Sequence, residues 1–399
     1  MNMNAAFRRF AEERYKINYW ADCQRDGARK KPQVSAGLIF KSIVYQAPLG
    51  VGSLLQLDQM GRTQELRDLL GSSREIAGGS DSTHLRALSQ WAMGPTTEAL
   101  YANHIRLRHQ GLAKTALSTG KEVILAIADG SYFGGFDFSV LAIAGGIPHA
   151  LDMEASPGRG HELAVSRELM KRAVGKLGKG FATHLVYDGL MTVKADFANA
   201  RNDWGLHLVV KTSEETLEIV QSSKGAWVGL SQRDLERAGV EFISGLDSKR
   251  GVHYEVYAQS QVPWVGSALK FNVAWVKETH LKGKDKGRTF EFWVLTTDET
   301  LSAAELREIA HHRWSIENLQ FKETNEQVGS KKAYIKNPRA KEALLRIWFL
   351  GMALLKEFKA HLETLPEWVN WTVKKTKKLV AQVILFGFPC EAPANHSPL

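Results

Sequence analysis

The sequence predicts a mixed α/β protein that begins with a helical region, and three observations support this prediction. Apolar residues recur at helical spacing up to about residue 117. From Lys121 onward, short apolar runs separated by glycine-rich turns replace that pattern. These runs alternate with helical segments, which is typical of a sheet flanked by helices. At 399 residues, the chain is long enough for two or three domains.

The composition is that of an ordinary globular protein with a basic surface. Hydrophobic residues make up 44% of the chain, and Lys and Arg exceed Asp and Glu to give a net charge of +9. This excess attracts polyanions such as nucleic acid, although a basic protein without such a partner has the same composition. Cys23 and Cys390 are the only cysteines, which excludes a disulfide framework and a cysteine-rich zinc site.

The sequence contains no recognisable membrane-directed segment. It has no run of about 18 apolar residues, and residues 1–25 are polar and mixed in charge. We therefore expect a cytoplasmic protein without a membrane partner.

Residues 1–118 are expected to form a helical N-terminal region. Phe40, Ile43 and Val44 recur at helical spacing, and the segment 82–88 has the pattern of a capped helix start. Five basic side chains make the region a candidate DNA-binding module: Arg62, Arg86, Arg106, Arg108 and Lys114. For any one of them, a solvated helix face is an equally good explanation.

Residues 119–212 contain the elements of the predicted sheet. Strands are expected at 123–128, 140–144 and 150–154, then a helix at 162–176, a strand at 184–187, a helix at 193–204 and a strand at 207–211. The order βββαβαβ is that of the ribonuclease H-like fold, a mixed sheet flanked by helices. In that fold, the first and fourth strands lie side by side at the centre of the sheet.

The sequence that follows is β-rich and then helical again. Residues 213–299 are interpreted as an insertion into the same domain, with strands at 253–258, 269–277 and 288–295. The domain resumes over 300–356, where Ser302 and Glu305 form a capping box that opens a helix ending near Gly329. A mostly apolar helix covers 340–355, and residues 357–399 form a C-terminal region with a lysine-rich segment at 374–378.

Two acidic residues follow the apolar runs assigned to the central strands. Asp129 and Asp188 each precede a glycine, and we expect both at the C-terminal ends of their strands. Carboxylates at that position are held rigidly and face a crevice. Glu317 belongs to the helix that begins near Ser302 and is the third candidate. We expect these three side chains to converge.

Three converging carboxylates suit metal-dependent chemistry on a phosphodiester. Mg²⁺ prefers carboxylate oxygens and retained waters, and two ions about 3.5–4 Å apart can activate a nucleophile and stabilise the leaving oxygen. We assign Asp129 as the ligand that bridges two Mg²⁺ ions, with Asp188 and Glu317 each completing the shell of one ion. Mn²⁺ can substitute in such a site.

Each acidic residue also has an ordinary structural explanation. An Asp-Gly pair after a strand is usually a turn. Glu317 lies four residues after Arg313, which is the spacing of an ion pair on a helix surface.

The neighbours of Glu317 on its helix are assigned to binding and packing. His311 and His312 are adjacent and do not share a helix face, so we assign them to DNA contact or packing rather than to metal binding. Trp314 and Ile316 are expected in the core, where they would hold the helix against the sheet.

Several motifs in this order resemble the DDE-type transposases of bacterial insertion sequences, in the branch whose ribonuclease H-like catalytic domain carries a β-rich insertion. The most specific match is Thr296-Thr297, then LSAAEL at 301–306 and HRWSIEN at 312–318, continued by FKETN at 321–325. Further matches are ADG at 128–130, YDG at 187–189, LVVK at 208–211 and NPRA at 337–340. The resemblance spans about residues 30–355 and is weakest at the N-terminus.

The resemblance implies DNA transposition: nicking of double-stranded DNA at the element's ends, then transfer of the freed 3′-hydroxyl to a target. Asp129, Asp188 and Glu317 match the catalytic residues of the family. Arg313 matches an arginine that contacts DNA phosphate, a task that suits its planar fork of donors. Lys211 lies in the matched segment after the second Asp and is assigned to DNA binding.

The sequence departs from the family pattern at two positions. The expected Tyr before the arginine is Ala310, for which His312 or its neighbour could substitute as a phosphate donor. The expected Lys after the glutamate is Thr324, with Lys322 and Lys331 as replacements. These departures concern the grip on DNA ends and the formation of a hairpin intermediate, not the metal ligands. In some relatives a Trp of the insertion stacks on a flipped base; the eligible residues, all assigned to the core, are Trp264, Trp275 and Trp293.

Other functions remain compatible with these residues. One is a ribonuclease H-like nuclease without strand transfer, and another is a domesticated protein that binds DNA without cutting it. The resemblance implies double-stranded DNA as the partner and a homodimer as the working assembly, located in the bacterial cytoplasm and on the nucleoid when bound to DNA.

Overall fold

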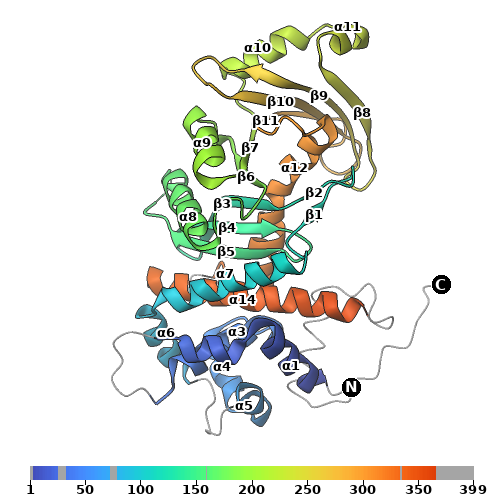
Figure 1. Ribbon diagram of the computed structural model, residues 1–399. Helices are drawn as coiled ribbons and strands as arrows, with labels where there is room; N and C mark the ends of the chain where they lie inside the picture. The colour runs from blue at the N-terminus through green and yellow to red at the C-terminus, as the bar shows by residue number, and fades with distance from the viewer. Residues whose placement is uncertain (1–2, 26–32, 72–78, 159, 333–334, 365–399) are drawn as a thin grey trace, which may run out of the picture.

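The computed structural model describes residues 3–25, 33–71, 79–158, 160–332 and 335–364. Within these ranges the chain forms a large mixed sheet flanked by helices, with a helical region packed against one end of the sheet (Figure 1). The long helix α14 (Pro338–Glu363) lies between the sheet and the N-terminal helices and contacts both. The predicted mixed α/β class is therefore confirmed. The lysine-rich segment 374–378 lies outside the described residues.

The N-terminal part is helical, as predicted. Its helices are α1 (Met3–Tyr15), α2 (Ile17–Cys23), α3 (Ala36–Leu49), α4 (Leu54–Gly61), α5 (Gln64–Leu70), α6 (Asp81–Ser89) and α7 (Met93–His109). Hydroxyl side chains cap several of them, because they accept from the otherwise unpaired N–H groups of the first turn. The helix predicted from residue 82 begins at Asp81, and its N-cap is Ser80, whose hydroxyl accepts from Thr83 N at 3.2 Å.

In the described ranges, the main sheet has nine strands in the order β5-β4-β3-β6-β7-β11-β10-β9-β8. They are β3 (Leu125–Phe133), β4 (Phe136–Ala144), β5 (His149–Ala155), β6 (His184–Asp188), β7 (His207–Thr212), β8 (Glu241–Asp247), β9 (Val252–Pro263), β10 (Lys270–His280) and β11 (Thr289–Thr296). Strands β3 to β5 pair antiparallel, and β6 is parallel to both β3 and β7. The predicted adjacency of the first and fourth strands is confirmed, because these are β3 and β6.

Strand β3 does not end at its Asp-Gly pair, and this prediction was wrong. Asp129 and Gly130 pair with Val140 and Ser139 of β4, and the strand continues to Phe133. Two glycines with positive φ, 57° and 112°, then make the turn into β4. The pairing with β6 does stop near the predicted point, at Ile127 and Val186. Strand β3 therefore separates from β6 after Ile127 but stays paired with β4 up to Phe133.

Helices flank the sheet, and short elements connect it to the rest of the chain. They are the two-residue strands β1 (Thr115–Ala116) and β2 (Glu122–Val123), the helices α8 (Glu162–Leu177) and α9 (Lys194–Asn199), a 3₁₀ turn (Gly189–Met191) and a π-helical turn (Ala200–Trp204). The helices predicted at 162–176 and 193–204 are thus confirmed.

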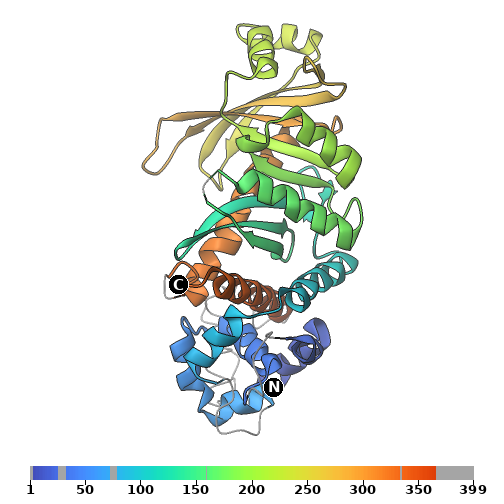
Figure 2. The same ribbon diagram turned by 90° about the vertical axis from the view of Figure 1, so that its left-hand side faces the viewer.

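The β-rich segment extends the same sheet, because β11 pairs antiparallel with β7. The strands predicted at 253–258, 269–277 and 288–295 correspond to β9, β10 and β11. Strand β8 and the helices α10 (Glu218–Trp227) and α11 (Gln232–Arg237) were not predicted. Figure 2 shows these helices covering the outer part of the sheet, at the end opposite the N-terminal helices.

The predicted capping box is present at the start of α12 (Ala303–Ile316). Glu305 N donates to the Ser302 hydroxyl at 3.4 Å, and Ser302 N donates to Glu305 Oε2 at 2.9 Å. The helical path continues through a π-helical turn (Glu317–Lys322) and α13 (Glu323–Val328), and it ends at Gly329, whose φ is 66°. This agrees with the predicted end.

Replacing Ser302 with alanine is expected to cost about 1 kcal/mol of folding free energy, because one of the two reciprocal caps is lost. Urea denaturation measures this cost. Ser222, an exposed residue of α10, provides the control, and its replacement with alanine should be close to neutral. Equal effects of the two changes would contradict a stabilising cap.

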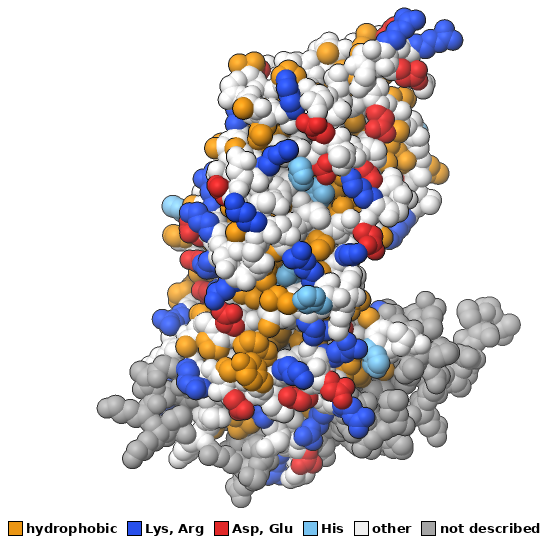
Figure 3. All heavy atoms as spheres, in the orientation of Figure 1, with side chains coloured by type: hydrophobic (Ala, Val, Ile, Leu, Met, Phe, Trp, Pro, Cys, Tyr) orange, Lys and Arg blue, Asp and Glu red, His pale blue; other side chains and the backbone are white. Residues whose placement is uncertain are grey.

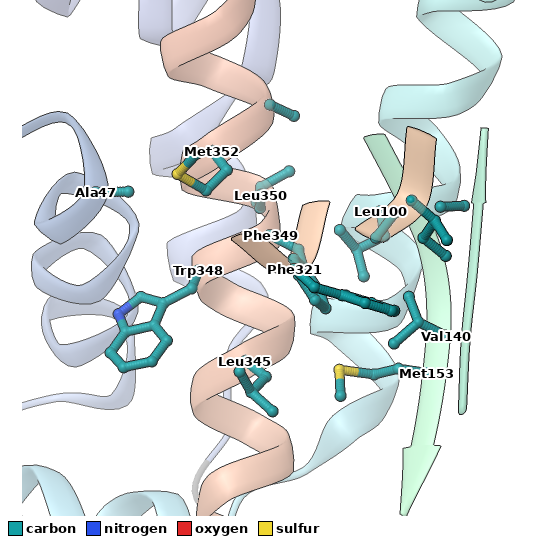
Figure 4. Close-up of a cluster of buried hydrophobic side chains, with 14 of the residues drawn as sticks. Ala47, Leu100, Val140, Met153, Phe321, Leu345, Trp348, Phe349, Leu350 and Met352 are labelled. Atoms are coloured by element: carbon teal, nitrogen blue, oxygen red, sulfur yellow. The ribbon is translucent and has the colours of Figure 1, made fainter. Parts of the chain in front are cut away.

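Helix α14 is longer than predicted and forms the centre of a hydrophobic core. It begins after the N-cap Asn337 and buries Leu345, Trp348, Phe349 and Met352 (Figure 4). Its Trp348 Nε1 donates to Gln46 Oε1 of α3 at 2.7 Å. The core therefore joins the N-terminal helices to the sheet.

Among the described residues, no single helix is long and apolar enough to cross a membrane. Only α3 and α4 taken together reach that composition, and they are bent by 104° relative to each other.

Candidate functional site

Asp129 and Asp188 occupy equivalent positions on neighbouring parallel strands. The last residues paired between β3 and β6 are Ile127 and Val186, and each Asp lies two residues further along. Because side chains alternate along a strand, each Asp is on the sheet face of the paired residue that precedes it. Parallel pairing thus brings two residues that are remote in sequence to one place.

Local hydrogen bonds orient both carboxylates. Asp129 Oδ1 accepts from Gly130 N at 2.9 Å. Asp188 is the last residue of β6 and the N-cap of the 3₁₀ turn, where its Oδ1 accepts from Leu190 N at 3.1 Å. The second Asp-Gly pair is therefore a strand end, as predicted, whereas the first is not.

Arg313 of α12 links Asp129 to Glu317. Its Nη1 donates to Asp129 Oδ2 and to Glu317 Oε1, both at 3.3 Å. Since both oxygens lie 3.3 Å from one nitrogen, they are at most twice that distance, 6.6 Å, apart. The ion pair between Arg313 and Glu317 on the helix surface is thus present. Arg313 also makes a tertiary contact with Asp129 of the sheet.

The environment of Asp129 opposes its ionisation. Burial raises its pKa to about 7, Arg313 acts in the opposite direction, and the negative charges of Glu317 and Asp188 raise it further. Both other carboxylates therefore lie close enough to act on Asp129. A perturbed carboxylate of this kind is typical of functional sites.

The three carboxylates do not form a closed metal cage in this structure. Over the described part of the chain, no group of three His, Cys, Asp or Glu side chains is arranged as a metal site. A guanidinium nitrogen lies between two of the three acids, where a shared cation would bind. The oxygen donors are nevertheless those that Mg²⁺ prefers.

Lys211 lies directly beside this group. It is paired with Asp188 across β6 and β7, and its Nζ is 4.0 Å from the ring centre of Phe292 and 4.2 Å from that of Trp314. Burial and the nearby Arg313 lower its pKa to about 8. Together with Asp188, Arg313 and Trp314, it lines a cavity of about 790 Å³.

His311 and His312 both line a second cavity beside α12, although they have different partners. His311 Nε2 lies 2.8 Å from Glu278 Oε1 of β10, so this side chain belongs to the packing between α12 and the sheet. His312 is half-buried, and the volume of this second cavity is about 690 Å³. Burial lowers its pKa, and Glu308 opposes this shift. His311 therefore packs against Glu278, and neither histidine lines the cavity beside Asp188.

Lys322 and Lys331 are exposed and lie away from the two cavities. Lys322 ends the π-helical turn, and the backbone N–H of Lys331 donates to Asn325 Oδ1 at 2.9 Å. Neither residue is among those lining the cavities beside Asp188 and His312. The structure brings Asp129, Asp188, Glu317, Arg313 and Lys211 together and leaves these two lysines outside the group.

Two residues near the site were not predicted to belong to it. Trp314, expected in the core, is 38% exposed and lines both cavities, whereas Ile316 is buried as expected. Arg250, in the turn between β8 and β9, also lines both cavities, and its Cζ is 5.5 Å from the Trp314 ring centre. The basic turn Lys249-Arg250-Gly251 is the sequence feature that could have indicated it.

Other candidate residues have structural roles. Trp264, Trp275 and Trp293 are buried, as expected, and the last two stack with ring centres 5.4 Å apart. Arg106, a candidate DNA contact, instead pairs with Glu357 of α14 at 2.5 Å, and it is largely buried there. This assignment was therefore wrong, because a tertiary ion pair cannot be inferred from the charge of an isolated helix.

Comparison of the chain with models of known protein families gave no match, and comparison with curated proteins gave none either.

Proposed function

We propose that the chain is a DDE-type transposase of a bacterial insertion sequence, which cuts double-stranded DNA at the element's ends and transfers the freed strand. The observation that carries this proposal is the grouping of Asp129, Asp188 and Glu317 where β3 and β6 separate, with Arg313 in contact with the first and the last of them. The order of strands β5-β4-β3-β6-β7 supports it, since this is the order of the ribonuclease H-like fold. The extension of the sheet between β7 and α12 matches the insertion of that branch.

The donor set fits a divalent cation. Asp129, Asp188 and Glu317 would hold Mg²⁺, which when bound supplies a nucleophile at neutral pH and neutralises charge developing at phosphorus. Burial is the main cause of the raised pKa of Asp129, and the two other carboxylates raise it further, so a cation bound beside Asp129 would offset this repulsion.

The surrounding side chains can position a DNA strand. Arg313 presents a fork of donors that suits a phosphate group. The Lys211 ammonium, with a pKa of about 8, stays protonated at neutral pH and offers a second positive charge beside Asp188. Trp314 forms an apolar wall next to both, and the faces of nucleobases stack on such aromatic rings. Two protomers would be needed to hold both ends of an element, hence the proposed homodimer.

An excision assay tests this function. The purified chain is incubated with Mg²⁺ and a plasmid in which a marker is bracketed by the DNA that flanks the reading frame. We expect a released marker fragment and joined products, and none of either with Asp188→Ala. Nicked plasmid without joined product would favour a nuclease. Binding of the plasmid without cleavage would favour a DNA-binding protein. Excision that survives Asp188→Ala would contradict the assigned role of Asp188.

DNA binding is expected to weaken steeply with salt. Lys and Arg side chains are distributed over the face seen in Figure 3, among fewer acidic ones. If binding involves about six phosphate contacts, affinity should fall by about 10³-fold between roughly 50 and 200 mM salt. Fluorescence anisotropy with a labelled duplex measures this slope. A flat response would contradict binding through backbone phosphates.

A further inference from the structure

One nitrogen atom of Arg313 contacts two of the three candidate carboxylates. Its Nη1 is a donor to Asp129 Oδ2 and to Glu317 Oε1 at equal distances of 3.3 Å. These are two of the three carboxylates that the proposed function assigns to a divalent cation. A cation shared by them would have to lie between the same two oxygens, and the guanidinium already lies there.

The contacts of Arg313 differ from those of an exposed ion pair on a helix surface. Its side chain is 17% exposed and that of Asp129 is 15% exposed, so their contact is only weakly screened by solvent. Glu317 is more accessible, with 49% of its side chain exposed. Arg313 therefore joins a shielded carboxylate on the sheet to a solvent-accessible carboxylate on its own helix.

Arg313 also lines a cavity that contains two other cations. Lys211 and Arg250 line the same cavity as Arg313, and Arg313 contributes to the lowered pKa of Lys211. Acidic side chains line this cavity as well, and Glu278 pairs with Arg250 at 3.7 Å. The guanidinium thus lies between two of the three carboxylates and a cavity wall that includes Lys211 and Arg250. Any cation that takes its place beside the carboxylates leaves three positive side chains facing the cavity.

We propose that Arg313 is a built-in counter-ion that competes with the divalent cation for Asp129 and Glu317, so that loading of the site requires the guanidinium to leave both carboxylates. This inference rests on the proposed function, because it takes the same three acids as cation ligands. The competition keeps cation affinity low in the free protein. It also makes the guanidinium available to an incoming phosphate when the site is loaded.

Binding of Mn²⁺ to the full chain, measured by calorimetry, tests the competition without any cleavage step. Arg313→Gln removes the competing charge and keeps a polar side chain of similar reach. We expect it to tighten Mn²⁺ binding about tenfold, since a charge-assisted contact no longer has to be broken. Arg313→Lys keeps the charge without the fork and should remain near the wild type.

Two controls separate this competition from a general loss of positive charge. Arg167 pairs with the buried Asp196 through two hydrogen bonds of 2.8 and 2.7 Å, away from the three acids, so Arg167→Gln matches the charge change at another pair. Lys211→Gln removes a cation beside Asp188 that has no described hydrogen bond to the acids. We expect no change with the first and a smaller gain than that of Arg313→Gln with the second.

The outcomes also separate the inference from the function on which it rests. Unchanged or weaker Mn²⁺ binding by Arg313→Gln, or an equal gain with Lys211→Gln, would overturn the competition while leaving the carboxylate site in place. Absence of Mn²⁺ binding that depends on Asp129, in the wild type and in all folded variants, would overturn both. Thermal melting followed by circular dichroism establishes that each variant is folded.

Discussion

Replacing Asp129 with asparagine is expected to abolish DNA cleavage and to make the fold more stable above pH 7. Cleavage should fall at least about a thousandfold, because a carboxylate assigned to bridge the catalytic cations is lost. Stability should rise because burial and two neighbouring carboxylates raise the pKa of Asp129 from 3.8 to about 7. Opposite effects on activity and stability are the mark of a strained functional residue.

The pH dependence of this gain follows from the direction of the shift. Between about pH 4 and pH 7 the unfolded chain loses its Asp129 proton while the folded protein retains it, so wild-type stability falls as pH rises through this window. Above pH 7 the cost is constant and on the order of 4 kcal/mol. An asparagine side chain has no such proton, so the Asp129→Asn variant should lose this part of the pH dependence.

Urea denaturation of the wild type and Asp129→Asn across this pH range measures the effect, in buffer with a chelator. Asp203→Asn, a change at an exposed residue of the π-helical turn, is the control and should alter stability little. A variant that is less stable than the wild type above pH 7 would show that Asp129 contributes favourable contacts instead of strain.

Replacing Arg346 with methionine is expected to destabilise the protein by about 3–5 kcal/mol, the cost of breaking a buried ion pair. Arg346 Nη1 donates to Asp152 Oδ1 at 2.5 Å, and Asp152 is fully buried. Arg172 and Tyr101 donate to the other oxygen, each at 2.9 Å. This group fastens helices α7, α8 and α14 to strand β5, and thereby the helical region to the sheet.

A second change distinguishes lost pairing from lost packing. Burial alone would raise the pKa of Asp152, but Arg346 and Arg172 outweigh it and hold that pKa below its usual value. Combining Arg346→Met with Asp152→Asn removes the uncompensated charge and should recover part of the stability. A single variant that loses less than about 1 kcal/mol would contradict the importance of the pair. Chemical denaturation measures both.

The central strands and helices could be predicted because their apolar periodicity is strong. Strands β4 to β7 and helix α8 are continuous apolar or amphipathic segments bounded by turn residues, and burial fixes their type. Strand β8 was missed because it lies at one edge of the sheet and all of its side chains are half-buried or exposed, which leaves no clear alternation in the sequence. The far end of β3 was missed because its hairpin partner, not its own pattern, prolongs it.

The placement of the candidate site could be predicted in part. The adjacency of Asp129 and Asp188 follows from strand order, which the sequence indicates, and the approach of Glu317 follows from the helix that carries it. The exposure of Trp314 does not follow, because it depends on how α12 crosses the sheet and on the cations of β7 and of the β8–β9 turn. These contacts join segments that are far apart in the sequence, so no local sequence pattern predicts them.

The central claim is that Asp129, Asp188 and Glu317 bind a divalent cation together. Anomalous scattering from crystals of the full chain soaked with Mn²⁺ tests this claim most directly. We predict anomalous peaks within bonding distance of Asp129 and of at least one of the other two carboxylates, with Arg313 turned away from them. Peaks that lie elsewhere, with Arg313 still bonded to Asp129 and Glu317, would contradict it.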